Sequence, residues 1–184
     1  MTSMTPTFGF FDLPDYREWM PGDPDFRRTS FLEPETEGER LNLTGRVLTK
    51  SGAPLADVRI EFWQANSAGV YALDKFKLRG TQRTNGDGAF ALETIMPGTT
   101  GRIRHINFLA AVSVSGRAQP LLLCAAISFA TDDELNRTIV PEDVPNVRPG
   151  AHKYRDDPSF LSLDRLKVEN GVRRARYDIV FDIE

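Results

Sequence analysis

The chain has 184 residues, of which 40% are hydrophobic and 27% charged, and its formal net charge is −3; this composition is typical of one soluble globular domain. A single cysteine excludes an internal disulfide and a multi-cysteine zinc site, and two histidines exclude any site that needs three. The charge argues against nucleic acid, no apolar run approaches the ~20 residues of a membrane helix, and the first residues do not resemble a secretory signal, so we expect a cytoplasmic protein.

Residues 1–40 are rich in proline and acidic residues and show no hydrophobic periodicity. They are also rich in aromatic side chains, among them Phe8, Phe10, Phe11, Tyr16, Trp19 and Phe26. A disordered linker contains few aromatic residues. We therefore predict an irregular N-terminal arm, residues 1–40, that packs against the domain or against a partner chain, and a single domain at residues 41–184.

Alternating apolar and polar residues begin at Leu41 and are typical of strands with one buried face. The pattern predicts three such strands, at residues 41–48, 58–63 and 89–95. Between the last two, Asn85-Gly86-Asp87-Gly88 predicts a hairpin turn or a short connection.

Two richer apolar runs, at residues 105–112 and 121–129, predict central strands that are buried on both faces. Residues 131–170 are polar and rich in proline, with one short helix predicted at 158–166. A last strand is predicted at 176–183. The sum is an all-β sandwich with a loop-rich segment before its last strand.

Three local features bear on chemistry. His105 and Asn107 alternate along a strand, so their side chains project from one face, either as a polar pair at a sheet edge or as part of a site. The run from Trp63 to Tyr71 takes a strand into a loop, with Trp63 either a core residue or a wall of a pocket. His152-Lys153-Tyr154 is either a solvated loop or an extended segment in which the histidine and the tyrosine point the same way. Cys124 lies in an apolar run and is predicted to be buried.

A spaced series of residues between positions 43 and 71 resembles the signature of the intradiol ring-cleavage dioxygenases. The matching residues are Leu43-Thr44-Gly45-Arg46-Val47, Gly52, Leu55, Ile60-Glu61-Phe62, Trp63-Gln64-Ala65-Asn66 and Gly69-Val70-Tyr71. The resemblance continues through Thr84–Gly98 and the final strand, and it covers residues 41–130 and 173–184. It implies a β-sandwich of mixed topology and enzymes that cleave catechols with a ferric iron held by two tyrosines and two histidines.

By this resemblance Tyr71 stands at the first tyrosine ligand and His105 at the first histidine ligand. Arg102, three residues before the histidine, stands near the arginine that stabilises negative charge on the ring. Asn107 occupies the position of the second histidine, and Thr99-Thr100 follow Pro97-Gly98 where the second tyrosine is expected. Two of the four ligands are therefore missing, and amide or hydroxyl groups in their place supply no negative charge.

We accordingly expect no metal cofactor. If the protein is instead an atypical dioxygenase, its cofactor would be Fe(III). The predicted catalytic residues are Tyr71, His105 and Arg102; the predicted substrate contacts are Asn107, Thr100 and Trp63; iron ligands, if iron is bound, would be Tyr71 and His105 with His152 and Tyr154.

Three hypotheses follow. The first is a divergent enzyme of aromatic compound metabolism, in which acid–base chemistry without metal cyclises, isomerises or cleaves a phenolic or polyketide-like molecule in the former catechol pocket. The second is a non-catalytic subunit that pairs with a catalytic intradiol dioxygenase chain. The third is an atypical Fe(III) dioxygenase. As partners we expect a small aromatic or phenolic ligand, no nucleic acid and no membrane, and either a homo-oligomer or a pairing with a related chain.

Overall fold

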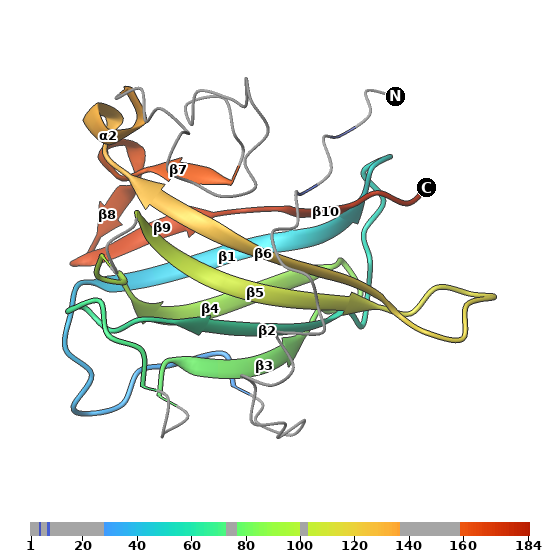
Figure 1. Cartoon of the computed structure of the whole chain (residues 1–184), viewed down its shortest axis with the longest axis horizontal. Helices are drawn as coiled ribbons and strands as arrows, with labels where there is room; N and C mark the ends of the chain where they lie inside the picture. Colours follow the sequence, from blue (N-terminus) through green and yellow to red (C-terminus); the bar gives the residue numbers. More distant parts are fainter. Residues whose placement is uncertain (1–3, 5–6, 8–27, 73–76, 100–102, 137–158) are drawn as a thin grey trace, which may run out of the picture.

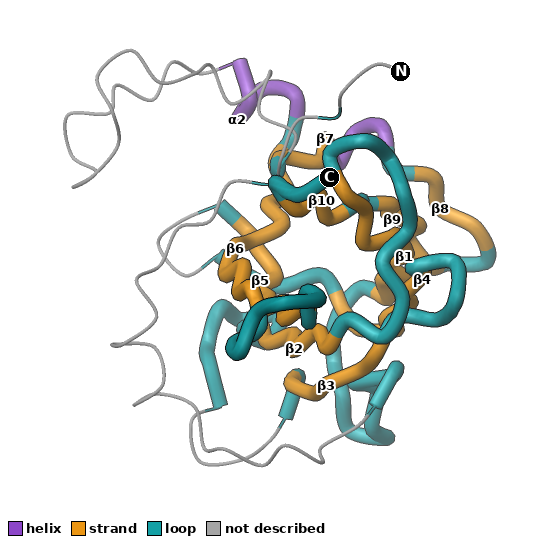
Figure 2. The backbone as a smooth tube through the Cα atoms, turned by 90° about the vertical axis from the view of Figure 1, so that its right-hand side faces the viewer, coloured by secondary structure: helices purple, strands orange, loops and turns teal. Residues whose placement is uncertain are grey.

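The computed structural model describes residues 4, 7, 28–72, 77–99, 103–136 and 159–184. Two sheets pack face to face, and the hydrophobic core lies between them (Figures 1 and 2). The strands are β1 (Arg40–Thr49), β2 (Arg59–Gln64), β3 (Arg79–Arg83), β4 (Ala89–Ile95), β5 (Arg104–Val112), β6 (Leu121–Ala130), β7 (Phe160–Ser162), β8 (Lys167–Glu169), β9 (Val172–Arg176) and β10 (Ile179–Phe181). The described helices are α2 (Asp132–Asn136) and a 3₁₀ helix at Leu163–Arg165.

The first sheet has the strand order β3-β2-β5-β6-β7, and the second has β10-β1-β9-β8 with β4 also paired to β1. Most neighbours are antiparallel, but β6 and β7 run parallel, and β1 runs parallel to both β9 and β10. This mixture of directions gives the β-sandwich of mixed topology that the sequence predicts.

Side chains that alternate along the strands fill the space between the sheets. Phe62 of β2 and Phe108 of β5 are fully buried on one side, and Leu43 of β1 and Leu92 of β4 face them from the other sheet. Burial of one such side chain stabilises the fold by about 1.5–3 kcal/mol. Phe31, which precedes β1, joins this core and is 1% exposed. The described residues just before β1 therefore pack against the sandwich.

Five predicted strands agree with the structure within two residues: β1, β2, β4, β5 and β6. The prediction that residues 105–112 and 121–129 are buried on both faces is wrong in part. The core face of β5 is buried, whereas Leu109 and Ala111 on its outer face are only half-buried. The 85–88 turn is a short connection and not a hairpin, because it joins β3 in one sheet to β4 in the other.

The single strand predicted at 176–183 is wrong. The chain forms β9 and β10 with a break at Tyr177-Asp178, because Asp178 Oδ1 accepts a hydrogen bond from the backbone N–H of Arg46 and so replaces one backbone partner of β1. The helix predicted at 158–166 is also wrong, because residues 160–162 pair with β6 as β7 before the 3₁₀ helix begins.

In the part of the chain that the structure describes, no helix is both long enough and apolar enough to cross a membrane.

Candidate functional site

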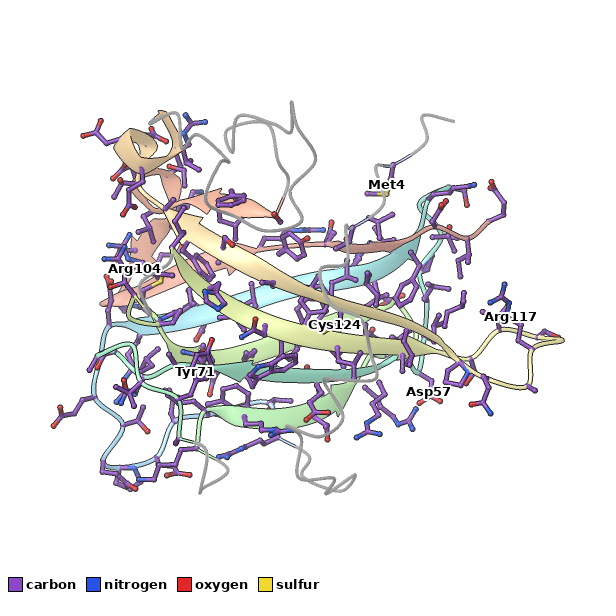
Figure 3. All side chains as sticks on the ribbon, in the orientation of Figure 1. Met4, Asp57, Tyr71, Arg104, Arg117 and Cys124 are labelled. Atoms are coloured by element: carbon purple, nitrogen blue, oxygen red, sulfur yellow. The ribbon has the colours of Figure 1, made fainter. Side chains whose placement is uncertain are left out.

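The site begins where β2 ends, at one end of the sandwich. After Gln64 the chain makes a tight turn in which the Asn66 side-chain oxygen accepts hydrogen bonds from the backbone N–H groups of Ala68 (3.0 Å) and Val70 (2.9 Å). The backbone closes the same turn, since Asn66 N–H donates to the carbonyl of Val70 over 2.9 Å. The next residue is Tyr71, which lies at the same end of the molecule as Arg104 at the start of β5 (Figure 3).

Three of the predicted side chains meet at this point. Tyr71 Oη lies 3.0 Å from His105 Nε2 and 3.0 Å from Asn107 Nδ2. Tyr71 comes from the loop after β2, whereas His105 and Asn107 alternate on β5 and so share one face of its sheet. The structure therefore brings together residues that are 34 and 36 positions apart in the chain.

The direction of each hydrogen bond follows from the partners. His105 Nδ1 lies 2.9 Å from the backbone carbonyl of Ile103, which can only accept, so in the neutral ring Nδ1 carries the proton and Nε2 is the acceptor. Tyr71 Oη then donates its proton to Nε2. Because Oη has no second proton, it accepts from the Asn107 amide. All the bonds run one way, from Asn107 through Tyr71 and His105 to Ile103.

Trp63 lies beside this group. It pairs with Asn107 across β2 and β5, and paired residues share a face, so Trp63 stands on the outer face of the sheet. Its side chain is half-buried. The interpretation of Trp63 as a core residue is therefore wrong, because its neighbour Phe62 is the residue that points into the core.

The same outer face carries an ion pair and a thiol. Arg79 donates to Glu61 Oε1 through Nε (3.0 Å) and Nη2 (2.6 Å), and both side chains are largely buried. Cys124 is 4% exposed, as predicted, and burial together with the charge of Glu61 raises the pKa of its thiol to about 11. A paired and largely buried charge therefore lies next to Trp63 on this face, since Arg79 is the partner of Trp63 in β3.

Four predicted site residues, Arg102, Thr100, His152 and Tyr154, lie outside the described residues. Two hollows of about 270 and 320 Å³ are lined mainly by residues of α2, β7 and the β9–β10 segment, and Tyr71 lines neither of them. Sequence reasoning also missed two contributors to the site, Asn66 and the carbonyl of Ile103. The spacing Asn66-x-x-Gly69 was a usable signal for the first, since it repeats Asn85-x-x-Gly88; a backbone carbonyl leaves no signal in the sequence.

In the ranges that the structure describes, the donor groups do not match the ferric site that the resemblance implies. Among the described residues, one phenol and one imidazole converge, with a neutral amide at the position of the second imidazole. The lone pair of His105 Nε2 faces the hydroxyl of Tyr71 and shares its proton. Within the same residues, no group of three or more His, Cys, Asp or Glu side chains could hold a metal ion.

Comparison with known sequences gives a consistent result. The model of a protein family described as "Dioxygenase" matches residues 12–180. The chain is 35% identical over 112 residues to a protocatechuate 3,4-dioxygenase beta chain from Burkholderia cepacia, covering 55% of this chain and 45% of that protein. It is 31% identical over 171 residues to a catechol 1,2-dioxygenase from Pseudomonas sp. strain EST1001, covering 83% and 54%. The chain thus spans about half, or less, of the curated relatives it matches.

Solved structures extend this likeness to the whole fold. The dioxygenase domain of a dioxygenase–carbohydrate-binding fusion from Streptomyces sp. SirexAA-E superimposes with a TM-score of 0.70 at 27% identity, covering 98% of this chain and 100% of that one. A 3-chlorocatechol 1,2-dioxygenase from Rhodococcus opacus 1CP superimposes with a TM-score of 0.63 at 25% identity, covering 97% and 72%.

Proposed function

The chain belongs to the intradiol ring-cleavage dioxygenases, and we propose that it is a divergent member that performs acid–base chemistry on a small phenolic or aromatic molecule without a metal ion. The reaction would be a cyclisation, an isomerisation or a lyase step in the former catechol pocket. The observation that carries the proposal is the one-way hydrogen-bond chain from Asn107 through Tyr71 to His105.

In the proposed mechanism Tyr71 and His105 move one proton together. An acidic hydroxyl of the ligand gives its proton to Tyr71 Oη as the Tyr71 proton passes to His105 Nε2, which leaves a ligand anion, a neutral tyrosine and an imidazolium. The carbonyl of Ile103 holds His105 in the tautomer that can accept this proton and stabilises the imidazolium that forms. The return of the proton to another ligand atom completes the reaction.

Asn107 supports this assignment because it stands where the family has its second histidine ligand. An imidazole at its position would bring a metal ligand, whereas the Asn107 amide donates to Tyr71 Oη and leaves the phenol proton directed at His105. Loss of even an outer-shell partner weakens metal binding about 10–100-fold. The loss of one phenolate and one imidazole from the family's set should cost more than that.

The remaining substrate contacts are part of the proposal. Trp63 pairs with Asn107 on the outer face of the sheet and offers an aromatic surface to a ligand ring. Arg102, two residues before the start of β5 in the sequence, would stabilise negative charge on the ligand, and Thr100 would border the pocket.

The test uses 4-nitrocatechol, a catechol-shaped acid whose ionisation changes its visible spectrum. Protein treated with a metal chelator should bind the probe and ionise it below the pH at which it ionises in buffer. His105→Gln and Tyr71→Phe should bind the ionised probe about 10–100-fold more weakly, so that ionisation of the bound probe moves toward the pH at which it occurs in buffer. The proposal fails if the native protein binds the probe only after iron is added, or if it then cleaves the ring of catechol, which would identify an atypical ferric dioxygenase.

A relative named as the beta chain of protocatechuate 3,4-dioxygenase favours assembly from more than one kind of chain, and it motivates a second candidate, a non-catalytic subunit that pairs with a catalytic intradiol dioxygenase chain. This candidate predicts that the purified chain forms a stable complex when it is expressed together with an intradiol dioxygenase chain from the same genome. A stable homo-oligomer that ionises 4-nitrocatechol by itself would rule it out.

A further inference from the structure

The described part of the chain contains the same turn twice. In Asn66–Val70 and in Asn85–Ala89, the asparagine side-chain oxygen accepts two backbone N–H groups, over 3.0 and 2.9 Å in each turn. In both turns the asparagine carbonyl also accepts from a glycine three residues later, Gly69 or Gly88, and each glycine has a positive φ, of 79° or 70°. The two turns therefore share their local hydrogen bonds and backbone conformation.

Only the first turn leads into the site. The Asn66 turn fixes Val70 through two hydrogen bonds, and Tyr71 is the next residue. From the other side, Gly98 N–H donates to the carbonyl of Asn66 over 2.8 Å. A side chain at Gly98 would collide with the backbone of Ser67 and Gly69. The turn is therefore held between β2 and the segment after β4.

The buried side-chain amide of Gln64, two residues before Asn66, anchors the start of this turn. Gln64, 2% exposed, donates to the carbonyl of Ile95 over 2.9 Å and accepts from the hydroxyl of Thr94 over 2.8 Å. These bonds tie the end of β2 to the end of β4 across the sandwich. The position of Tyr71 thus depends on contacts from both sheets.

We propose that Asn66 is a positioning residue that sets the contact between Tyr71 Oη and His105 Nε2. This inference rests on the proposed function, in which that contact transfers the proton. Asn66 itself acts only through the backbone of the turn, since its side-chain oxygen is occupied by the N–H groups of Ala68 and Val70.

The test compares Asn66→Ala with Asn85→Ala, which removes the same two bonds at the other turn. The readout is the ¹⁵N resonance of His105 Nε2 at a pH where the ring is neutral, separated from that of His152 with an H152Q variant. Tyr71→Phe defines the resonance without the phenol contact. N66A should move the resonance most of the way to the Y71F position, and N85A should leave it at its native position.

Asn66→Asp provides the rescue, because a carboxylate oxygen can accept the same two N–H groups; it should return the resonance toward the native position. The inference is overturned if N66A keeps the native resonance, or if N85A moves it equally. If Y71F does not move the resonance at all, the Tyr71–His105 contact is absent in solution, and the proposed function fails instead.

Discussion

The Asn66 and Asn85 turns have the same hydrogen bonds but different consequences, and they lie at opposite ends of β2. The Asn85 turn connects β3 of one sheet to β4 of the other, close to Asp57, whose N–H donates to the carbonyl of Thr84. Figure 3 shows Asp57 and Tyr71 at opposite ends of the molecule. One turn closes the sandwich, and the other places a phenol against a histidine. The same asparagine turn can therefore serve a structural or a functional role, depending on the residue that follows it.

The largest expected effect falls on the Tyr71 end. His105→Gln and Tyr71→Phe should each weaken binding of ionised 4-nitrocatechol by about 10–100-fold, because each removes a hydrogen bond that involves a charged species, worth about 1.5–3 kcal/mol. Absorbance titration measures the dissociation constant. Arg83→Gln, at the Asn85 end, breaks an exposed pair with Asp57 and should leave binding unchanged. Equal losses of probe affinity in all three variants would show that the Tyr71 end is not the binding site.

A comparably large effect on stability is expected at the Asn85 end. The buried hydroxyl of Thr84 donates to the carbonyl of Leu55 (2.7 Å) and accepts from the N–H of Val58 (3.0 Å). Thr84→Val leaves both groups without this partner and should lower the free energy of unfolding by about 2–3 kcal/mol. Urea denaturation measures it. Probe binding by the folded variant should stay native; a loss of binding would show that this end reaches the site.

A Thr→Val substitution at the Tyr71 end should lower the free energy of unfolding less than Thr84→Val does, but it should weaken ionisation of the bound probe. Thr94→Val removes one hydrogen bond, to Gln64, and should lower the free energy of unfolding by about 1–2 kcal/mol. Because Gln64 anchors the loop that carries Tyr71, ionisation of bound 4-nitrocatechol should also weaken. Native ionisation in T94V would mean that the anchor does not reach Tyr71.

Substitution of either asparagine should have the same effect on the stability of the protein, although the effects on the Tyr71–His105 contact should differ. Asn66→Ala and Asn85→Ala each remove two exposed hydrogen bonds and should each lower the free energy of unfolding by about 1 kcal/mol. Matched thermal denaturation curves would confirm that the turns are structurally equivalent. A much larger loss in one variant would show that the turn has further structural contacts and is a poor control.

The smallest effect concerns Cys124, on the outer face of the sheet. Its folded-state pKa, about 11, lies above the ordinary value of 9.0. The stability that comes from keeping the thiol protonated is fully present below pH 9 and is lost as the pH rises toward 11. Native protein should therefore lose up to about 1 kcal/mol more than Cys124→Ala between pH 7 and pH 10. Equal losses in urea denaturation would contradict the shifted pKa.

The sequence predicted the strands that have one buried face. Burial of every second side chain produces an alternation of apolar and polar residues, and this alternation is visible in the sequence. It missed β3, whose residues Arg79–Arg83 are mostly polar and pair at a sheet edge, and the three-residue strands β7 and β8, which are too short to show a period. It misplaced the end of the fold because Asp178 breaks the last strand through a bond to Arg46, a residue 132 positions away.

The meeting of Tyr71, His105 and Asn107 was foreseeable only in part. Alternation on β5 puts His105 and Asn107 on one face, but the return of Tyr71 to that face depends on the Asn66 turn and on Gly98 after β4. Neither the direction of the hydrogen bonds nor the tautomer of His105 follows from the sequence, since both depend on the carbonyl of Ile103.

The most direct test of the central claim is the visible spectrum of the purified native protein, recorded with its iron content before and after incubation with ferric iron. Proton transfer between Tyr71 and His105 without a metal predicts a colourless protein that takes up no stoichiometric iron. A red-brown tyrosinate-to-iron absorption band that disappears in Tyr71→Phe would contradict it.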